Sequence, residues 1–355
     1  MSCDRLDRFH ASMRKRRLDA YLSVRPSNIR YLTGFTGEDS VLLVTGKGAF
    51  LLTDGRFDIQ ARKEVRSAEV VIIDRKYEEA ARRLRLARAR RIGYESSWLS
   101  MASFRKCSGG RAERWVSDKD LIEPLRMTKE PREILAIEAA STTAAASLLS
   151  VLSSGLDGKT ERDVAADLDR EMKRRGAEES SFPLIVACGA RSAMPHAVPT
   201  WNRIVTGEPL IIDFGAKKGG YCSDETVTIL PCNPRRPLRK VYDAVRRAQE
   251  VGIAAIRPGV ACKKVDARVR ESLDRSGYLK YFVHSTGHGV GLDVHERPAL
   301  SPRSKDLIEE SMVVTVEPGV YLPGIGGVRL EDTVKVTGSG CERITFLPKA
   351  EKLLI

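Results

Sequence analysis

The chain has 355 residues, 42% of them hydrophobic and 30% charged, which is typical of a globular protein and excludes a fibrous or wholly disordered one. Its length allows two domains with a sizeable core. The net charge of +13 is compatible with a nucleic-acid partner. The densest basic run, residues 82–91, has no aromatic side chain between its arginines, so we expect a solvated helix face and no nucleic acid.

The cellular compartment is predicted from what the sequence lacks. No apolar run approaches the 18 or so residues of a membrane span, and the first ten residues lack the apolar core of a signal peptide. The seven cysteines are odd in number and have no CxxC spacing, which does not suit a disulfide framework. We therefore expect a cytoplasmic protein with reduced thiols and no membrane contact.

Residues 1–123 alternate helical and strand patterns, which predicts an α/β domain of modest size. A helix is expected over residues 6–19. Short apolar runs predict strands at residues 21–24, 41–46, 48–53 and 70–74. Residues 122–134 are expected to form a linker into a second domain, residues 124–355, with Pro131 in the first turn of its first helix.

The second domain shows a weak internal duplication. Helices are predicted at about 132–152 and, after a capping box, at 160–175. Residues 154–177 resemble residues 257–278 in their glycines, loop and apolar spacing. The order histidine, proline, acidic residue then follows in both copies: His196, Pro199 and Asp213, and His295, Pro298 and Glu317. Two such halves are expected to face each other across a shared cleft.

A first acidic pair lies in a predicted hairpin. Asp213 and Asp224 occupy two strand patterns that are joined by the turn signal KKGG. A loop at residues 218–219 would place the two carboxylates directly opposite each other, and a loop at residues 219–220 would place them diagonally. In both registers they share one face of the hairpin.

A second strand–turn–strand unit holds Glu317 and Glu331, which lie symmetrically about Gly324. The apolar flanks of both pairs predict burial rather than exposed hairpins, and buried like charges are destabilising without a cation. His288, with a glycine on each side, lies in a segment that lacks the helical HExxH spacing of a zinc site. Four carboxylates and one imidazole favour a pair of hard divalent ions, Mn²⁺ first, with Co²⁺, Fe²⁺ and Zn²⁺ as alternatives.

These segments resemble the metallopeptidases of family M24, on the branch with Xaa-Pro aminopeptidase (aminopeptidase P) and Xaa-Pro dipeptidase (prolidase). The matching motifs are IIDFGA, YCSDETVT, HSTGHGVGLDVHE, VEPGVY and GGVRLEDTV, and residues 21–58 resemble the N-terminal domain of the same branch. The resemblance implies an α/β creatinase-like domain at 1–123. It also implies an α+β pita-bread catalytic domain with a pseudo-twofold duplication at 124–355.

The resemblance also implies roles for the metal ligands. Asp224 and Glu331 would bridge two metal ions, Asp213 would hold one ion, and His288 and Glu317 would hold the other. Two ions that share a water lower its pKa and hold it as hydroxide, which would attack the peptide carbonyl.

The other site residues are expected around this centre. Glu317 would also carry a proton to the leaving nitrogen. His196 and His295 match the family histidines that contact the substrate carbonyl and its developing oxyanion. His284 would line the substrate pocket, and Arg329 would support either the substrate or the ligand cluster.

The implied activity is hydrolysis of the Xaa-Pro bond at the N-terminus of peptides, most like aminopeptidase P, in a homodimer. Prolidase is the alternative. A creatinase-like C–N hydrolase or a non-catalytic adaptor is more remote, because both usually lack part of the ligand set. Two positions depart from the family. Val227 stands where an arginine is common. Some dipeptidases have a carboxylate-binding arginine a few residues after the substrate histidine, whereas here Arg297 follows His295 by two residues and position 299 is alanine. The second departure argues against strict dipeptide specificity.

Overall fold

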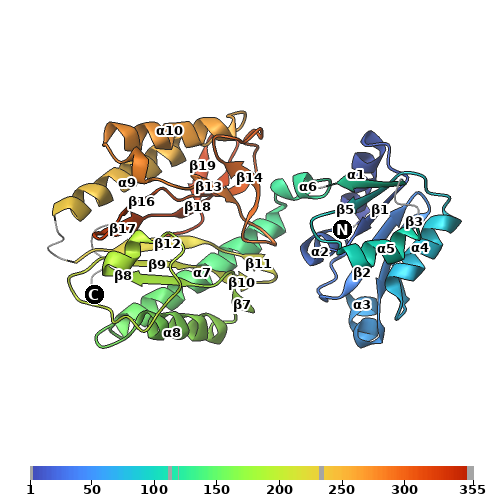
Figure 1. The fold of residues 1–355 in the computed structure, drawn as a ribbon, viewed down its shortest axis with the longest axis horizontal. Coiled ribbons are helices and arrows are strands. Elements are labelled where there is room, and N and C mark those ends of the chain that lie inside the picture. The colour runs from blue at the N-terminus through green and yellow to red at the C-terminus, as the bar shows by residue number, and fades with distance from the viewer. Residues whose placement is uncertain (1–2, 111–113, 119, 232–235, 350–355) are drawn as a thin grey trace. The chain divides into compact units, whose positions relative to one another are not determined.

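The structure is a computed structural model that describes residues 3–110, 114–118, 120–231 and 236–349. The chain forms two compact units, Met1–Arg126 and Met127–Ile355, each with its own core (Figure 1). The boundary falls inside the expected linker, part of which is helical: α6 (Glu123–Met127). The segment is therefore not an open linker over its whole length.

Side-chain hydrogen bonds explain why the start of this segment is ordered. Arg126 is buried and donates to the side chains of Ser27 and Asn28, which begin a helix of the N-terminal unit. Tyr31 donates to the carbonyl of Leu125. These bonds hold the segment up to Arg126 against its own unit.

The N-terminal unit is built on a six-stranded mixed sheet with the order β4-β3-β2-β1-β5-β6. Its strands are β1 (Ala20–Ser23), β2 (Ser40–Thr45), β3 (Gly48–Thr53), β4 (Glu69–Ile72), β5 (Ile92–Glu95) and β6 (Trp115–Asp118). Its other helices are α1 (Cys3–Lys15), α2 (Pro26–Thr33), α3 (Asp58–Glu64), α4 (Lys76–Leu86) and α5 (Met101–Ser108). The four predicted strands and the α/β class are confirmed.

Helix α1 ends earlier than residue 19, where we expected its end. Arg17 adopts a left-handed conformation with φ 55°, and the N–H of Leu18 bonds back to the carbonyl of Met13. This C-cap turns the chain toward β1. The apolar residue at position 18 belongs to the core but not to the helix.

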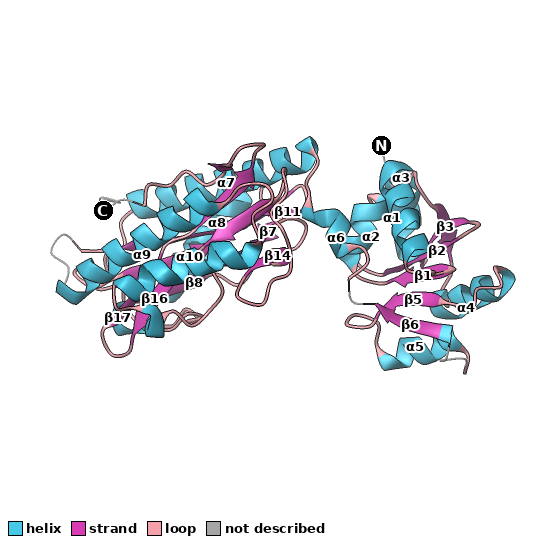
Figure 2. Cartoon of the chain, turned by 90° about the horizontal axis from the view of Figure 1, so that it is seen from above, coloured by secondary structure: helices cyan, strands magenta, loops and turns pink. Residues whose placement is uncertain are grey.

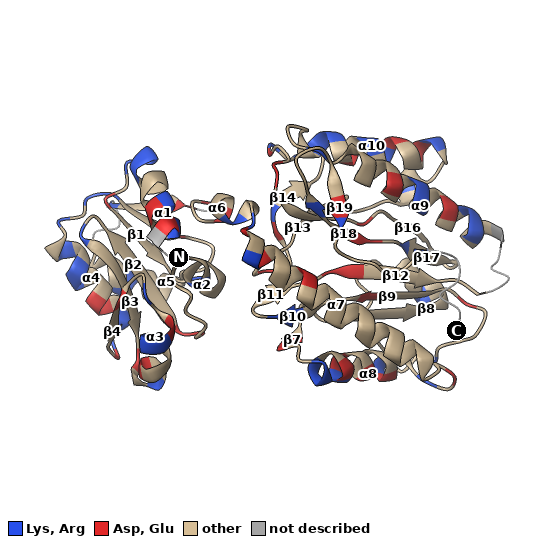
Figure 3. Cartoon of the chain, turned by 180° about the vertical axis from the view of Figure 1, so that it is seen from behind, with Lys and Arg blue, Asp and Glu red and all other residues tan. Residues whose placement is uncertain are grey.

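The basic run at residues 82–91 begins in α4. Leu84 is buried there, whereas Arg82 and Arg85 are exposed, as expected for a solvated helix face. The helix ends at Leu86, so the second half of the run is not helical. Figure 3 marks the Lys and Arg positions along this helix in blue and its acidic positions in red.

The second unit repeats one arrangement twice. In its first half α7 (Pro131–Ser153) and α8 (Glu161–Arg174) pack beside strands in the order β8-β9-β12. In its second half α9 (Arg236–Ala255) and α10 (Cys262–Arg275) pack beside the order β13-β15-β18. Figure 2 shows these helices flanking the strands. The predicted internal duplication is confirmed.

The strands of the first half are β7 (Glu179–Ser180), β8 (Ile185–Cys188), β9 (Leu210–Phe214), β10 (Ala216–Lys218), β11 (Tyr221–Cys222) and β12 (Glu225–Ile229). Those of the second half are β13 (Gly287–Gly289), β14 (Glu296–Leu300), β15 (Val313–Val316), β16 (Gly319–Leu322), β17 (Gly326–Arg329), β18 (Asp332–Val336) and β19 (Cys341–Arg343). Short 3₁₀ turns complete the described elements: η1 (Gly55–Phe57), η3 (Gly189–Ala193) and η4 (Leu279–Tyr281).

The helix starts of the second unit follow their sequence signals. Pro131 lies in the first turn of α7. At the start of α8 the hydroxyl of Thr160 accepts from the N–H of Asp163, and the carboxylate of Asp163 accepts from the N–H of Thr160. This capping box satisfies two backbone donors that a helix start otherwise leaves unpaired.

Helix α7 is long and apolar enough, by length and composition, to cross a membrane. Half of its most apolar window is buried inside the unit, where it packs against α8, β10 and β11. Our expectation that no run approaches this length is therefore wrong for α7. The alanines that lie between its larger core residues raise the mean hydropathy of the helix. The core helix of a globular domain passes the same test of length and composition.

The first acidic hairpin has the register that a loop at residues 219–220 predicts. Gly219 and Gly220 both have positive φ, 58° and 78°, as a two-residue hairpin turn of the primed type requires. Asp213 therefore lies opposite Thr226 and diagonal to Asp224. The second predicted strand–turn–strand segment runs from β15 to β18, and its strands pair symmetrically about Gly324, as predicted.

Candidate metal centre

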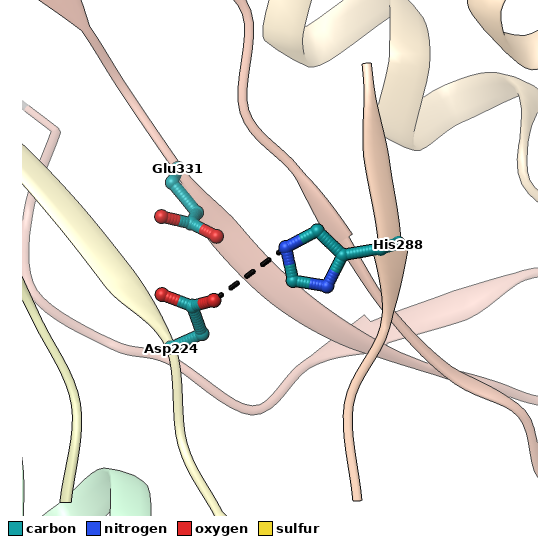
Figure 4. A group of neighbouring side chains, drawn as sticks. All are labelled: Asp224, His288 and Glu331. Atoms are coloured by element: carbon teal, nitrogen blue, oxygen red, sulfur yellow. Dashed lines mark ion pairs between the residues drawn. The ribbon is translucent and has the colours of Figure 1, made fainter. Parts of the chain in front are cut away.

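Three side chains from three different segments meet at one point of the second unit. Asp224 directly precedes β12, His288 is the middle residue of β13, and Glu331 connects β17 to β18. Their ligand atoms all lie within 4.8 Å of one another (Figure 4). His288 Nε2 is 3.6 Å from Asp224 Oδ2. One half of the duplication supplies Asp224, and the other supplies the remaining two.

The other two predicted ligands lie beside this group. Glu317 follows β15, and its Oε1 is 3.3 Å from His288 Nε2. Asp213 lies in β9 and interacts electrostatically with both Glu317 and Asp224. The structure thus brings all five predicted ligands together.

Burial and like charge dominate the electrostatics of the centre. Burial raises the pKa of Asp224 well above its usual value, and the neighbouring Glu331 raises it further. Burial likewise raises the pKa of Glu331, with Glu317 and Asp213 adding to the shift. Two carboxyl groups that resist ionisation in the metal-free protein are the groups that a divalent cation would stabilise as anions.

Glu317 and His288 behave as an ion pair. Burial disfavours the charge on Glu317, but the hydrogen bond with His288 holds the pKa of Glu317 below its usual value. Burial also disfavours the imidazolium, yet Glu317 raises the pKa of His288. In the metal-free protein the imidazole therefore takes the place of a cation beside this carboxylate.

Two carboxylate oxygens in the centre lack a hydrogen-bond partner among the described residues. Among the described residues, Asp213 Oδ1 and Glu331 Oε1 are buried without one. The second oxygen of Glu331 accepts from the hydroxyl of Thr226 at 2.7 Å. Buried, unpartnered carboxylate oxygens are costly unless a cation completes their coordination. The four carboxylates and one imidazole fit hard divalent ions.

Two glycines allow β13 to lie close to its neighbours. A Cβ atom on Gly287 would lie 2.0 Å from the carbonyl oxygen of Thr315, and one on Gly289 would lie 2.3 Å from that of Arg297. Both distances are far below a tolerable contact. The close backbone approach that we inferred from the glycines around His288 is confirmed, and it fixes the position of the imidazole between two strands.

Arg329 supports the centre from one side. Its side chain is 4% exposed, and its Nη2 donates to Asp213 Oδ2 at 2.5 Å. Its Nη1 donates to the hydroxyl of Tyr321 at 2.9 Å and to the carbonyl of Pro195 at 3.0 Å. The hydroxyl of Tyr321 is also 2.8 Å from Nε2 of His284. Through Tyr321, Arg329 thereby connects the predicted ligand Asp213 to the predicted pocket residue His284.

Sequence reasoning missed Tyr321 and Thr226. Tyr321 is buried and links His284 to Arg329, and Thr226 bonds Glu331 and accepts from Arg329 Nε at 3.2 Å. Both residues lie within motifs that we had quoted, VEPGVY and YCSDETVT. For Thr226 the available signal was its spacing of two residues from the predicted ligand Asp224, since residues two apart in a strand share a face.

The predicted oxyanion histidines lie near the centre. The rings of His295 and His288 have centroids 4.2 Å apart. His196 is exposed and interacts electrostatically with both His284 and His295. Desolvation lowers the pKa of His295, and His288 lowers it further. His295 is therefore a neutral imidazole at pH 7, which can donate one hydrogen bond to a carbonyl oxygen.

Comparison with known proteins identifies the family. Residues 132–338 match the model of metallopeptidase family M24, and residues 5–128 match the creatinase/prolidase N-terminal domain. The chain belongs to metallopeptidase family M24. Its fold is the creatinase-like domain followed by a pita-bread domain, as the resemblance implied. Membership implies that the site works with divalent metal ions.

Several relatives match over nearly their whole length. The Xaa-Pro dipeptidase of Pyrococcus furiosus is 35% identical over 99% of both chains. Among solved structures, the Xaa-Pro dipeptidase from Bacillus anthracis is 37% identical over 99% of both chains, with a TM-score of 0.95. The X-Pro aminopeptidase from Thermotoga maritima is 33% identical over 96% of this chain and 99% of its own, with a TM-score of 0.86.

The close approach of β13 to β15 leads to a first prediction. Gly287→Ala should remove most metal binding and destabilise the unit by several kcal/mol, because the new methyl group overlaps the Thr315 carbonyl and displaces β13. The matched control is Gly340→Ala, where a Cβ meets no atom within 4 Å. Thermal unfolding and metal titration of both variants check this. Equal behaviour of the two would show that β13 tolerates the displacement.

The buried like charges lead to a second prediction. Asp224→Asn should make the metal-free protein more stable than the wild type at pH 7, because one of the repelling buried carboxylates is gone. The same variant should lose the stabilisation that Mn²⁺ gives the wild type, since ligand binding stabilises only a competent site. Thermal unfolding with and without Mn²⁺ measures both effects. A metal-free variant less stable than the wild type would contradict the repulsion argument.

Proposed function

We propose that this protein hydrolyses the Xaa-Pro bond at the N-terminus of peptides with two divalent metal ions. The observation that carries the proposal is the cluster of four carboxylates and one imidazole, in which Asp224 and Glu331 are buried and two carboxylate oxygens lack any partner among the described residues. Full-length relatives named as Xaa-Pro dipeptidases and an X-Pro aminopeptidase support the choice of substrate class.

Five side chains would hold the ions: Asp213, Asp224, His288, Glu317 and Glu331. The family resemblance implies that Asp224 and Glu331 would be shared between both ions, and these two carboxylates meet in the structure. The oxygen-rich set favours Mn²⁺, and Co²⁺, Fe²⁺ and Zn²⁺ are the ions for comparison. When bound, such ions lower the pKa of a water molecule and polarise the scissile carbonyl.

The remaining chemistry falls to side chains around the ligands. Glu317, whose pKa is held low beside His288, is ionised at neutral pH and can accept a proton from water at a carboxylate oxygen. It can then deliver the proton to the leaving proline nitrogen. His295 and His196 would donate to the carbonyl oxygen as negative charge develops there. His284, held by the hydroxyl of Tyr321, would contact the substrate.

Dipeptides are the first substrates to test. Several relatives over nearly the full chain length are named as Xaa-Pro dipeptidases or prolidases. One structural observation favours a second candidate, an aminopeptidase P that cuts longer peptides. Arg297 is paired with Asp306, with Nε 3.3 Å from Oδ2, which reduces its charge toward a dipeptide carboxylate.

The quaternary structure is implied by the resemblance alone, whereas the compartment rests on the cysteine pattern of the sequence. We propose a homodimer in the cytoplasm, with no nucleic-acid partner. Sedimentation of the purified protein tests the dimer. Binding to RNA and DNA over a range of salt concentrations tests the last point, because non-specific affinity falls steeply with salt.

The third prediction concerns the activity itself. With Mn²⁺, the protein should release free proline from an Xaa-Pro dipeptide or the first residue from a longer Xaa-Pro peptide, and metal analysis should find about two ions per chain. Replacing Asp224 with asparagine should abolish turnover while the protein stays folded. The ratio of kcat/KM for dipeptide and longer peptide decides between the two candidates. Wild-type turnover by the asparagine variant would exclude the proposed ligand role.

The fourth prediction separates oxyanion contact from metal binding. His295→Ala should lower kcat by roughly 10²–10³-fold with little change in metal content, the range observed when one oxyanion donor is removed. His196→Ala should behave alike, since His196 interacts electrostatically with both His284 and His295. Steady-state kinetics and metal analysis check this. Loss of metal from the His295 variant would make that residue a ligand, and a change in KM alone would exclude the oxyanion role.

A further inference from the structure

The last described segment of the chain, residues 341–349, is fixed against the strands that carry two of the proposed ligands. After β19, the N–H of Ile344 donates to the carbonyl of Thr333 at 2.8 Å, and the N–H of Thr333 donates to the hydroxyl of Thr345 at 3.1 Å. Leu347 is buried in the core cluster of the first half. The segment therefore has a defined position in the unit.

Lys349 lies at the end of this segment and contacts two buried carboxylates at once. Its ammonium group forms an ion pair with Glu225 Oε1 and lies 3.5 Å from Asp332 Oδ1. The lysine side chain is 8% exposed, and each carboxylate side chain is 2% exposed. This cation is therefore largely shielded from solvent.

The two carboxylates flank the proposed bridging ligands. Glu225 follows Asp224 at the start of β12, and Asp332 follows Glu331 at the start of β18. Because successive side chains of a strand point to opposite faces, Glu225 and Asp332 point away from the metal centre. Lys349 thus joins the first half of the duplication to the second on the face opposite the ligands.

We propose that Lys349 is a positioning residue that sets the spacing between Asp224 and Glu331 from behind. The inference rests on the proposed metal centre. Backbone bonds already link these strands: the hydroxyl of Thr333 donates to the carbonyl of Asp224 at 2.7 Å. Asp332 also pairs with Arg343, whose Nε lies 3.0 Å from Oδ2. Without the ammonium, Glu225 loses the cation it pairs with, and its buried carboxylate repels that of Asp332 across the same junction. The two halves then separate at the point where one ion must reach both ligands.

Charge and position predict opposite effects of removing Lys349. By charge alone, the loss of a cation near a cluster of carboxylates makes the site more negative and should tighten the binding of Mn²⁺. By position, the loss moves Asp224 and Glu331 apart and should weaken binding. Residues that orient metal ligands typically change metal affinity by about 10–100-fold when mutated. Weaker binding therefore identifies the positioning role, because electrostatics cannot produce it.

The test is titration of metal-free protein with Mn²⁺ in a calorimeter. Lys349→Met keeps the length and apolar stem of the side chain and removes its charge. We expect its Mn²⁺ affinity to be about 10–100-fold weaker than that of the wild type. The matched control is Lys217→Met, which breaks a surface pair with Glu179 at 2.8 Å whose side chains are 30% and 59% exposed. The control should bind Mn²⁺ like the wild type.

A double variant keeps the inference testable if Lys349→Met does not fold. Lys349→Met combined with Glu225→Gln removes both charges and should recover most of the wild-type Mn²⁺ affinity and thermal stability. Unchanged or tighter binding in folded Lys349→Met, or a double variant as impaired as the single one, overturns the inference. If the wild type binds Mn²⁺ and cleaves Xaa-Pro peptides in that case, the proposed function stands. A wild type that binds no Mn²⁺ overturns both.

Discussion

The second unit depends on the repulsion between carboxylates that its fold forces together. Asp224 and Glu331 are buried a few ångströms apart, and burial raises the pKa of both. Glu331 adds to the shift of Asp224, and Glu317 and Asp213 add to that of Glu331. Their backbones belong to different halves of a duplicated domain, joined by the bond from the N–H of Glu331 to the carbonyl of Thr226 at 3.1 Å. A divalent cation held by both carboxylates would replace this repulsion with attraction and would thereby link the two halves.

Two backbone features bring the predicted ligand side chains close together. The two-glycine turn at residues 219–220 puts Asp213 and Asp224 on one face, and a loop longer or shorter by one residue would turn one of them away from the centre. On the opposite side, Gly287 lets β13 approach the carbonyl of Thr315. The imidazole of His288 reaches the carboxylates only because no side chain lies between these strands.

The sequence was most informative for features that depend on residues close together in the chain. Turn glycines, the Thr160 capping box and strand alternation predicted the elements of both units and the symmetry about Gly324. The proposed ligands were found because buried acidic residues in apolar strands are rare enough to require an explanation. Helix α6 was missed, because Arg126 orders it through side-chain bonds to residues almost a hundred positions earlier. Lys349 was missed as a supporting residue for a similar reason, because its partner Glu225 is distant in the sequence.

The distribution of cations shows how the unit tolerates so much buried negative charge. Arg329 compensates Asp213, Lys349 compensates Glu225 and Asp332, and a third buried cation, Lys129, lies 3.4 Å from Glu296, next to His295. Among the described residues, neither Asp224 nor Glu331 forms an ion pair with a lysine or arginine. A lysine there would compete with a metal ion for the same oxygens. The fold thus pairs the neighbouring carboxylates with lysine or arginine side chains and leaves Asp224 and Glu331 without such a partner. These two carboxylates lie where one ion could contact both halves.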